Sequence, residues 1–79
     1  MEEFQAVAAQ VKEKKPNFSQ EEGRTIYGLF KQANLGDNTS EKPSGDKLAE
    51  EKWDAWTAQK GLSKEEAAAK YVEFAKKFL

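Results

Sequence analysis

Tyr27, Phe30 and Lys31 form a short constellation that combines two aromatic rings with an ammonium group. Their positions i, i+3 and i+4 place all three on one face of a helix. Aromatic rings offer faces on which a flat ring can stack, and a lysine neutralises a phosphate as a compact point charge. The same spacing is also typical of two core aromatics beside a solvated lysine, and by spacing alone that second interpretation is the commoner case.

A second constellation joins Lys52 to Trp53 and Trp56. The tryptophans are three residues apart and share a helical face, and Lys52 lies about 100° round the helix from Trp53, at the edge of that face. Since the chain has few large apolar residues, we expect at least one tryptophan in the core. Taken alone, Lys52 is typical of a lysine whose stem covers apolar surface. Two lysines flanked by aromatics nevertheless indicate a pocket that stacks a flat ring and neutralises a phosphate.

The composition leaves little for catalysis. The chain contains neither cysteine nor histidine, which excludes disulfides, thiolate metal sites and every histidine-based triad. Ser19, Ser44 and Ser63 stand at helix-cap positions, with no evident base to activate them as nucleophiles. We therefore expect a protein that is not an enzyme, with no catalytic residue, no metal site and no cofactor.

Charge and hydropathy indicate where the protein works. Thirteen basic and 14 acidic residues leave a net charge of −1, which argues against a nucleic-acid partner. No apolar run approaches the roughly 18 residues that indicate a membrane span. The first residues include Glu2 and Glu3 and lack the basic start of a secretory signal. The expected location is the cytoplasm.

Four stretches show helical periodicity, and no strand-like alternation competes with them. Capping boxes mark two helix starts, at Ser19 with Glu22 and at Ser63 with Glu66. The expected limits are Pro16 for the end of the first helix, Ser19 and Gly36 for the second, residues 44–46 and Gly61 for the third, and Ser63 for the start of the fourth.

The second helix contains Gly23 and Gly28, which weaken it by up to about 1 kcal/mol each. We expect such a helix to be held by tertiary packing or approached closely by another group. A loop of residues 34–45 follows it, long enough to span a distance or to serve a function. The predicted fold is a single all-α domain over residues 1–79, a four-helix bundle.

Runs of residues along nearly the whole chain resemble the acyl-CoA-binding protein family. They cover residues 26–27, 31–33, 36–37, 52–56 and 61–67, with Phe4, Val11, Lys12 and Tyr71 at the expected separations. The resemblance implies an antiparallel four-helix bundle that binds one medium- to long-chain acyl-CoA ester without chemistry. It also implies an intracellular carrier and pool former that is monomeric and makes transient contacts with acyl-CoA-using enzymes.

The resemblance also assigns roles to individual residues. Tyr27 is expected to contact the adenine and phosphate region, Lys31 to pair with the 3′-phosphate, and Lys52 to reinforce that phosphate site. Tyr71 is expected to close over the ligand, with Lys12 beside it. The acyl chain is expected to lie in a groove between helices.

Four residues depart from the family pattern, and two of them, Phe30 and Leu48, stay within the expected ligand site. Phe30 replaces a second tyrosine, so the ring is kept and a hydroxyl is lost. Leu48 occupies the place of a phosphate-binding lysine. Gly23 and Arg24 replace apolar residues, which predicts a shorter or more polar end of the acyl groove. We expect binding to persist with altered affinity or chain-length preference.

Two other functions fit parts of the sequence. One is a small helical module that binds a protein partner and no small molecule, which an exposed apolar patch would favour. The other, weaker alternative is a hydrolase acting on the thioester, for which the sequence supplies no evident nucleophile.

Overall fold

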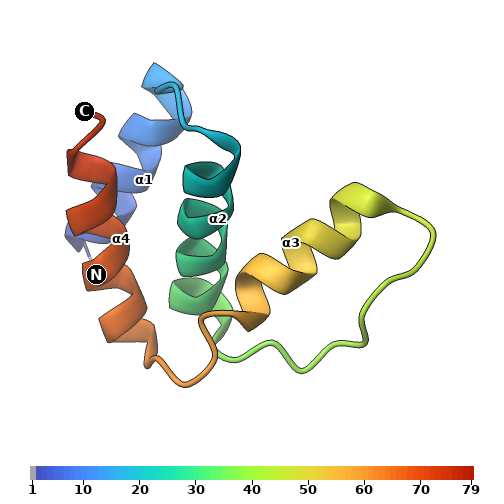
Figure 1. The fold of residues 1–79 in the computed structure, drawn as a ribbon. Helices are drawn as coiled ribbons and strands as arrows, with labels where there is room; N and C mark the ends of the chain where they lie inside the picture. Colours follow the sequence, from blue (N-terminus) through green and yellow to red (C-terminus); the bar gives the residue numbers. More distant parts are fainter. Residues whose placement is uncertain (1) are drawn as a thin grey trace.

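The computed structural model describes residues 2–79, which form four helices and no strand. The helices are α1 (Glu2–Lys14), α2 (Gln20–Leu35), α3 (Lys47–Thr57) and α4 (Lys64–Lys76). Helix α2 packs against both α4 and α3, and α1 packs against α4. Figure 1 shows α1, α2 and α4 gathered together, with α3 crossing beside α2 at the edge of the molecule. The all-α four-helix prediction is confirmed.

Both predicted capping boxes are present. Ser19 Oγ accepts a hydrogen bond from the Glu22 backbone N–H at 3.1 Å, and the Glu22 carboxylate accepts one from the Ser19 N–H at 2.8 Å. Ser63 and Glu66 form the same reciprocal pair, with both distances 3.1 Å. Each cap satisfies N–H groups that the first turn leaves free, and an N-cap contributes typically about 1 kcal/mol.

Helix α3 starts at the last position of the predicted range 44–46 and ends before the predicted Gly61. Its N-cap is Asp46 and not Ser44: Asp46 Oδ1 accepts hydrogen bonds from Leu48 N at 3.0 Å and Ala49 N at 3.3 Å. Gly45, with φ of +86°, turns the chain immediately before this cap. The helix ends at Thr57, and turns carry the chain on to Gly61, whose φ is +100°.

The buried core is built by α1, α2 and α4. Its residues are Phe4, Val7, Ile26, Leu29, Ala33, Ala67, Ala68, Tyr71, Val72 and Ala75. Helix α3 contributes no buried residue, so the expectation of a core tryptophan is wrong. Trp53 and Trp56 are half-buried, and their indole N–H groups donate to the carbonyls of Ser40 at 3.1 Å and Gly36 at 2.8 Å. Both tryptophans thus tie the long loop to α3.

Gly28 explains how α3 can lie so close to α2. A Cβ at Gly28 would collide with the backbone carbonyl of Ala55 on α3. Only hydrogen fits between the two backbones at this crossing, so any larger residue would push α3 away. The prediction that a glycine of this helix is approached closely is confirmed at Gly28.

A network of hydrogen bonds at the C-terminal end of α2, centred on Gln32 and Asp37, was not predicted. The buried Gln32 donates from Nε2 to Asp37 Oδ1 at 2.7 Å and to the Leu62 carbonyl at 2.8 Å, and Asp37 Oδ1 also accepts from Gly61 N at 2.9 Å. These bonds lower the pKa of Asp37, the Gly61 N–H most and the Gln32 amide next. They connect the C-terminal end of α2 with the turn between α3 and α4.

Candidate functional site

The predicted lysines and aromatic rings of α2 and α3 pair across the two helices. Lys52 Nζ on α3 lies 5.7 Å from the ring centroid of Tyr27 on α2. Lys31 Nζ on α2 lies 5.1 Å from the ring of Trp56 on α3. Each helix therefore supplies one lysine and one ring, and each such contact contributes roughly 0.5–1 kcal/mol at an exposed site. The structure thus places Lys52 beside Tyr27 and Lys31 beside Trp56, and Lys31 is not among the lining residues of the two cavities described next.

A cavity of about 310 Å³ opens between α2 and α3 beside these pairs, and we call it the lysine cavity. It is lined by Gln20, Gly23, Arg24, Tyr27, Leu48, Glu51, Lys52 and Ala55. Leu48 is 59% exposed, so an apolar side chain of α3 stands partly free in solvent at this cavity. Three of the predicted site residues, Tyr27, Leu48 and Lys52, thus line one hollow.

A second cavity of about 400 Å³ is mostly apolar, and we call it the aromatic cavity. It is lined by Val11, Lys15, Pro16, Phe18, Gly23, Ile26, Tyr27, Phe30 and Tyr71. Phe30 is 39% exposed although its ring lies 5.9 Å from that of the buried Phe4. The two cavities share Gly23 and Tyr27. Two mostly apolar hollows therefore adjoin, each with a lysine in its lining, and Tyr27 lies in the wall of both.

Tyr71 and Lys12 have different surroundings. Tyr71 is only 3% exposed, with its ring 5.0 Å from Phe4 and 6.0 Å from Phe30, and burial raises the pKa of its phenol. It therefore forms part of the inner wall of the aromatic cavity. Lys12 is exposed on α1 and is not among the lining residues of that cavity, whereas Lys15 is. Direct ligand contacts of Tyr71 and Lys12 stay predictions.

Lys15 was not predicted as a site residue. It follows the last residue of α1 and has φ of +46°, an unusual value for a residue other than glycine. This turn leads into Pro16, and both residues line the aromatic cavity. The Lys-Pro pair in the sequence signals the end of the helix, but its backbone conformation and its place beside the cavity depend on tertiary packing.

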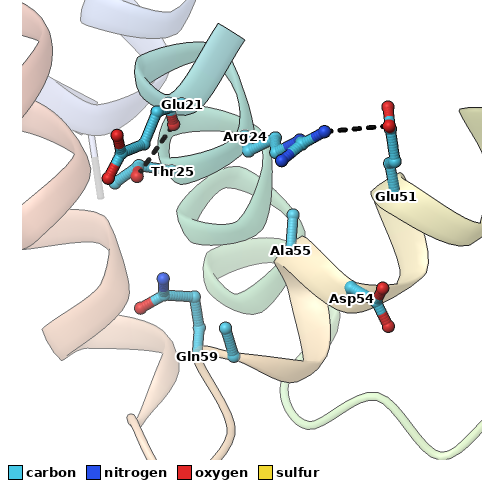
Figure 2. A pocket seen from close by; sticks show the side chains of 8 residues that line it. Glu21, Arg24, Thr25, Glu51, Asp54, Ala55 and Gln59 are labelled. Atoms are coloured by element: carbon cyan, nitrogen blue, oxygen red, sulfur yellow. Dashed lines mark hydrogen bonds and ion pairs between the residues drawn. The ribbon is translucent and has the colours of Figure 1, made fainter.

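A third cavity of about 260 Å³, the carboxylate cavity, is a poor site for an anion. Its lining includes Glu21, Glu51 and Asp54, and its one cation, Arg24, already pairs with Glu51 at 2.8 Å. Figure 2 shows this ion pair bridging α2 and α3, with Ala55 and Gln59 below it. The excess of negative charge would repel a phosphate, so the lysine cavity is the candidate anion site.

Within residues 2–79 no three metal-ligating side chains gather in a way that could hold an ion. In the same part of the chain, no helix combines the length and apolar character of a membrane span. The fold and cavities define a small helical protein with two adjoining, mostly apolar hollows that contain aromatic rings and lysines, which suits a ligand with an apolar tail and an anionic, ring-containing head.

Comparison with known proteins gives the family. The family model described as acyl CoA binding protein matches residues 1–75. An acyl-CoA-binding protein homolog of Drosophila melanogaster is 43% identical over 74 residues, covering 92% of this chain and 86% of the relative. Acyl-CoA-binding protein homolog 1 of Caenorhabditis elegans is 44% identical over 70 residues, covering 87% and 81%. The chain belongs to the acyl-CoA-binding protein family.

The fold agrees with this membership. The crystal structure of Oryza sativa acyl-CoA-binding protein 2 superposes with a TM-score of 0.87 at 41% sequence identity, covering 98% of this chain and 87% of the rice chain. The resemblance seen in the sequence is thereby confirmed.

Proposed function

We propose that this protein binds one medium- to long-chain acyl-CoA ester per chain and carries it unchanged. The observation that carries the proposal is the sharing of Tyr27 by two adjoining hollows with mostly apolar walls, one of which has the Lys52 ammonium 5.7 Å from the tyrosine ring. An acyl-CoA offers a matching part to each feature, an apolar chain to the walls and an anionic nucleotide to the ammonium group. Membership of the acyl-CoA-binding protein family supports the same ligand.

We assign the nucleotide end of the ligand to Tyr27, Lys31 and Lys52. Tyr27 stacks on or flanks the adenine, Lys31 pairs with the 3′-phosphate, and Lys52 adds a second positive charge. A hydrogen bond to a charged group contributes roughly 1.5–3 kcal/mol. In the free protein both ammonium groups rest against aromatic rings. These ring contacts hold both lysines at the junction of α2 and α3 in the free protein.

The acyl end is assigned to the apolar walls. Phe30 and Tyr71 line the aromatic cavity, and Leu48 adds apolar surface in the lysine cavity. Each methylene removed from water contributes about 0.8 kcal/mol, so a long chain provides much of the affinity. Lys12 is assigned a peripheral place beside the ligand, at the exposed surface of α1.

The proposed role is that of a carrier and not of an enzyme. The sequence lacks histidine and cysteine, and the serines of the two capping boxes donate no hydrogen bond to a base but accept from backbone N–H groups. We further propose a monomer working in the cytoplasm, which delivers acyl-CoA through transient contacts with the enzymes that use it.

Native mass spectrometry with hexadecanoyl-CoA tests the proposal. The expected spectrum shows one ligand per chain, and a thiol assay on the same mixture shows no release of free CoA. Release of thiol at a rate proportional to protein concentration would identify a thioesterase instead. If no acyl-CoA of any length forms a complex, acyl-CoA binding is excluded and a protein-interaction module becomes the better explanation.

A further inference from the structure

Lys15 has a backbone conformation that a residue with a side chain rarely adopts. Its φ is +46°, and within residues 2–79 it is the only residue other than glycine with a positive φ. Its N–H donates to the Val11 carbonyl at 2.9 Å and so closes the end of α1. Glycine is the usual residue at such a left-handed helix end, because a Cβ is strained there. Pro16 disfavours helical geometry at Lys15 but leaves the extended region open, so the proline alone does not impose the strain.

This turn brings Lys15 into the lining of the aromatic cavity. The other residues of that lining are apolar or aromatic, so Lys15 supplies its one charge. Lys12 and Lys14 are exposed on the same helix and do not line the cavity. Lys15 forms no ion pair or ring contact with any other residue of the described range 2–79. A strained backbone therefore places an ammonium group without a protein partner beside an apolar hollow.

Tyr27 relates this lysine to the rest of the site. Its side chain lies in the wall of both cavities, with Lys52 of α3 in the lining of one and Lys15 in the lining of the other. Figure 1 shows α1 and α3 on opposite sides of α2, and the two helices do not pack against each other. Positive charge is therefore available on both sides of the tyrosine and comes from different parts of the fold.

The covalent order of an acyl-CoA ester provides an anion for Lys15. The acyl chain is followed by the pantetheine arm, then the diphosphate, and then the ribose that carries the 3′-phosphate. If the acyl chain lies in the aromatic cavity and the 3′-phosphate lies near Lys31 and Lys52, the diphosphate lies between these two ends. Lys15 is the lysine on the aromatic-cavity side of Tyr27, and a lysine binds phosphate as a compact point charge.

We propose that Lys15 is a ligand-binding residue that pairs with the diphosphate of the bound ester, separately from the 3′-phosphate site. This inference rests on the proposed acyl-CoA binding. Residues held in sparsely populated backbone regions are common at ligand sites, where the strain holds a side chain in its working position. Lys15 fits this pattern, because glycine would end α1 with less strain but would leave the cavity without a cation.

Calorimetric titration with hexadecanoyl-CoA and with its 3′-dephospho form tests the inference. Lys15→Met keeps an apolar side chain of similar length and removes the charge. It is expected to weaken both esters by the same factor, at least about fivefold. Lys15→Arg keeps the charge and is expected to bind both within about twofold of the unmodified protein. Lys31→Ala is expected to weaken only the ester that carries the 3′-phosphate.

Lys14→Met is the matched control, because it removes the same charge from the preceding exposed residue, which lines neither cavity. It is expected to bind both esters within about twofold of the unmodified protein. Lys15→Gly separates binding from folding. It is expected to melt at a temperature at least as high as the unmodified protein, since glycine adopts a positive φ without strain, and to bind as weakly as Lys15→Met.

Three results would overturn the role of Lys15 while acyl-CoA binding stands. The first is a Lys15→Met protein that binds both esters as tightly as the unmodified protein. The second is an equal loss in Lys14→Met, which would show a general effect of net charge. The third is a loss in Lys15→Met for the ester with the 3′-phosphate alone, which would place Lys15 in the 3′-phosphate site. If the unmodified protein binds neither ester, both proposals fail.

Discussion

Lys52 of α3 holds its ammonium group 5.7 Å from the ring centroid of Tyr27 of α2. Within residues 2–79, α3 packs against α2 but not against α1 or α4, and it buries no residue of its own in the core. The contact between Lys52 and Tyr27 therefore spans the helix pair that depends most on surface interactions. A ligand that engages both residues bridges the same pair.

Removing either central lysine should weaken acyl-CoA binding. We expect Lys31→Ala to weaken it by more than about 1 kcal/mol, because a ligand phosphate then loses its charge-assisted partner. Lys52→Ala should weaken it in the same direction. Titration calorimetry with hexadecanoyl-CoA measures both effects.

Lys70→Ala is the control for net charge, because Lys70 lies on α4 beside a different cavity. It should leave the affinity within about twofold, as expected for an exposed charge remote from the ligand. Equal affinity of Lys31→Ala and the unmodified protein would show that the phosphate site lies elsewhere.

Gly23 and Gly28 should respond in opposite directions to the same change. Gly28→Ala places a Cβ against the Ala55 carbonyl and should lower the free energy of unfolding by roughly 1–3 kcal/mol. Gly23→Ala meets only open space and should raise it by up to about 1 kcal/mol through helix propensity. Urea denaturation measures both, and a Gly28→Ala protein as stable as the original would contradict the close crossing of α2 and α3.

Acid should weaken the hydrogen bonds that Asp37 accepts from Gln32 and Gly61 at the end of α2. Hydrogen bonds from Gly61 and Gln32 lower the pKa of Asp37 below its ordinary 3.8, so the charged form is favoured in the folded state. This contribution to stability is fully present above about pH 3.8, the ordinary pKa, and is lost as the pH falls through the lower pKa of Asp37 in the folded protein. Glu66, whose pKa is lowered by the Ser63 N–H and then its hydroxyl, acts in the same sense.

Thermal melting at a series of pH values tests this link. The melting temperature should fall below about pH 4, in the range where carboxylates protonate, and Asp37→Asn should reduce the slope there. Asparagine keeps the acceptor oxygen and removes the titrating charge, so the comparison isolates protonation. An unchanged slope in Asp37→Asn would show that Asp37 does not contribute to the acid sensitivity.

Local signals in the sequence predicted much of the fold. Ser19 and Ser63 with their glutamates three residues on define helix starts by themselves, because a capping box needs only neighbours along the chain. The same local chemistry made Ser44 and Asp46 equivalent candidates for the start of α3. The turn at Gly45 decides between them, and it depends on how the loop returns to α2.

Other features depend on residues far apart in the sequence. The buried Gln32 donates a hydrogen bond to the carbonyl of Leu62, 30 residues away, and no local sequence pattern around Gln32 predicts this contact. The tryptophans were expected to fill the core because large apolar residues are few. They instead bind loop carbonyls at the surface of α3, where an indole N–H finds an acceptor. Within the site, spacing grouped Tyr27 with Lys31 and Lys52 with the tryptophans, and the family resemblance joined the two groups. The contacts of Lys52 with Tyr27 and of Lys31 with Trp56 required the structure.

Ligand binding should stabilise the folded protein. Only 38% of the residues are hydrophobic, and two open cavities lie along α2, so the bound acyl chain adds apolar contacts that the free protein lacks. A hundredfold excess of ligand over Kd contributes about 2.7 kcal/mol, which corresponds to roughly 10–20 °C in a domain of this size. Differential scanning fluorimetry with hexadecanoyl-CoA measures the shift, and its absence at saturating ligand would contradict the account.

The most direct test of the central claim compares the affinities of hexadecanoyl-CoA and free CoA in one calorimetric series. If the nucleotide contacts Lys31 and Lys52 while the acyl chain occupies the aromatic cavity, hexadecanoyl-CoA should bind with a stoichiometry of one and at least about a hundredfold more tightly than CoA, since each buried methylene adds about 0.8 kcal/mol. Equal affinity of the two ligands, or no heat with either, would contradict the assignment of this fold and these cavities to acyl-CoA.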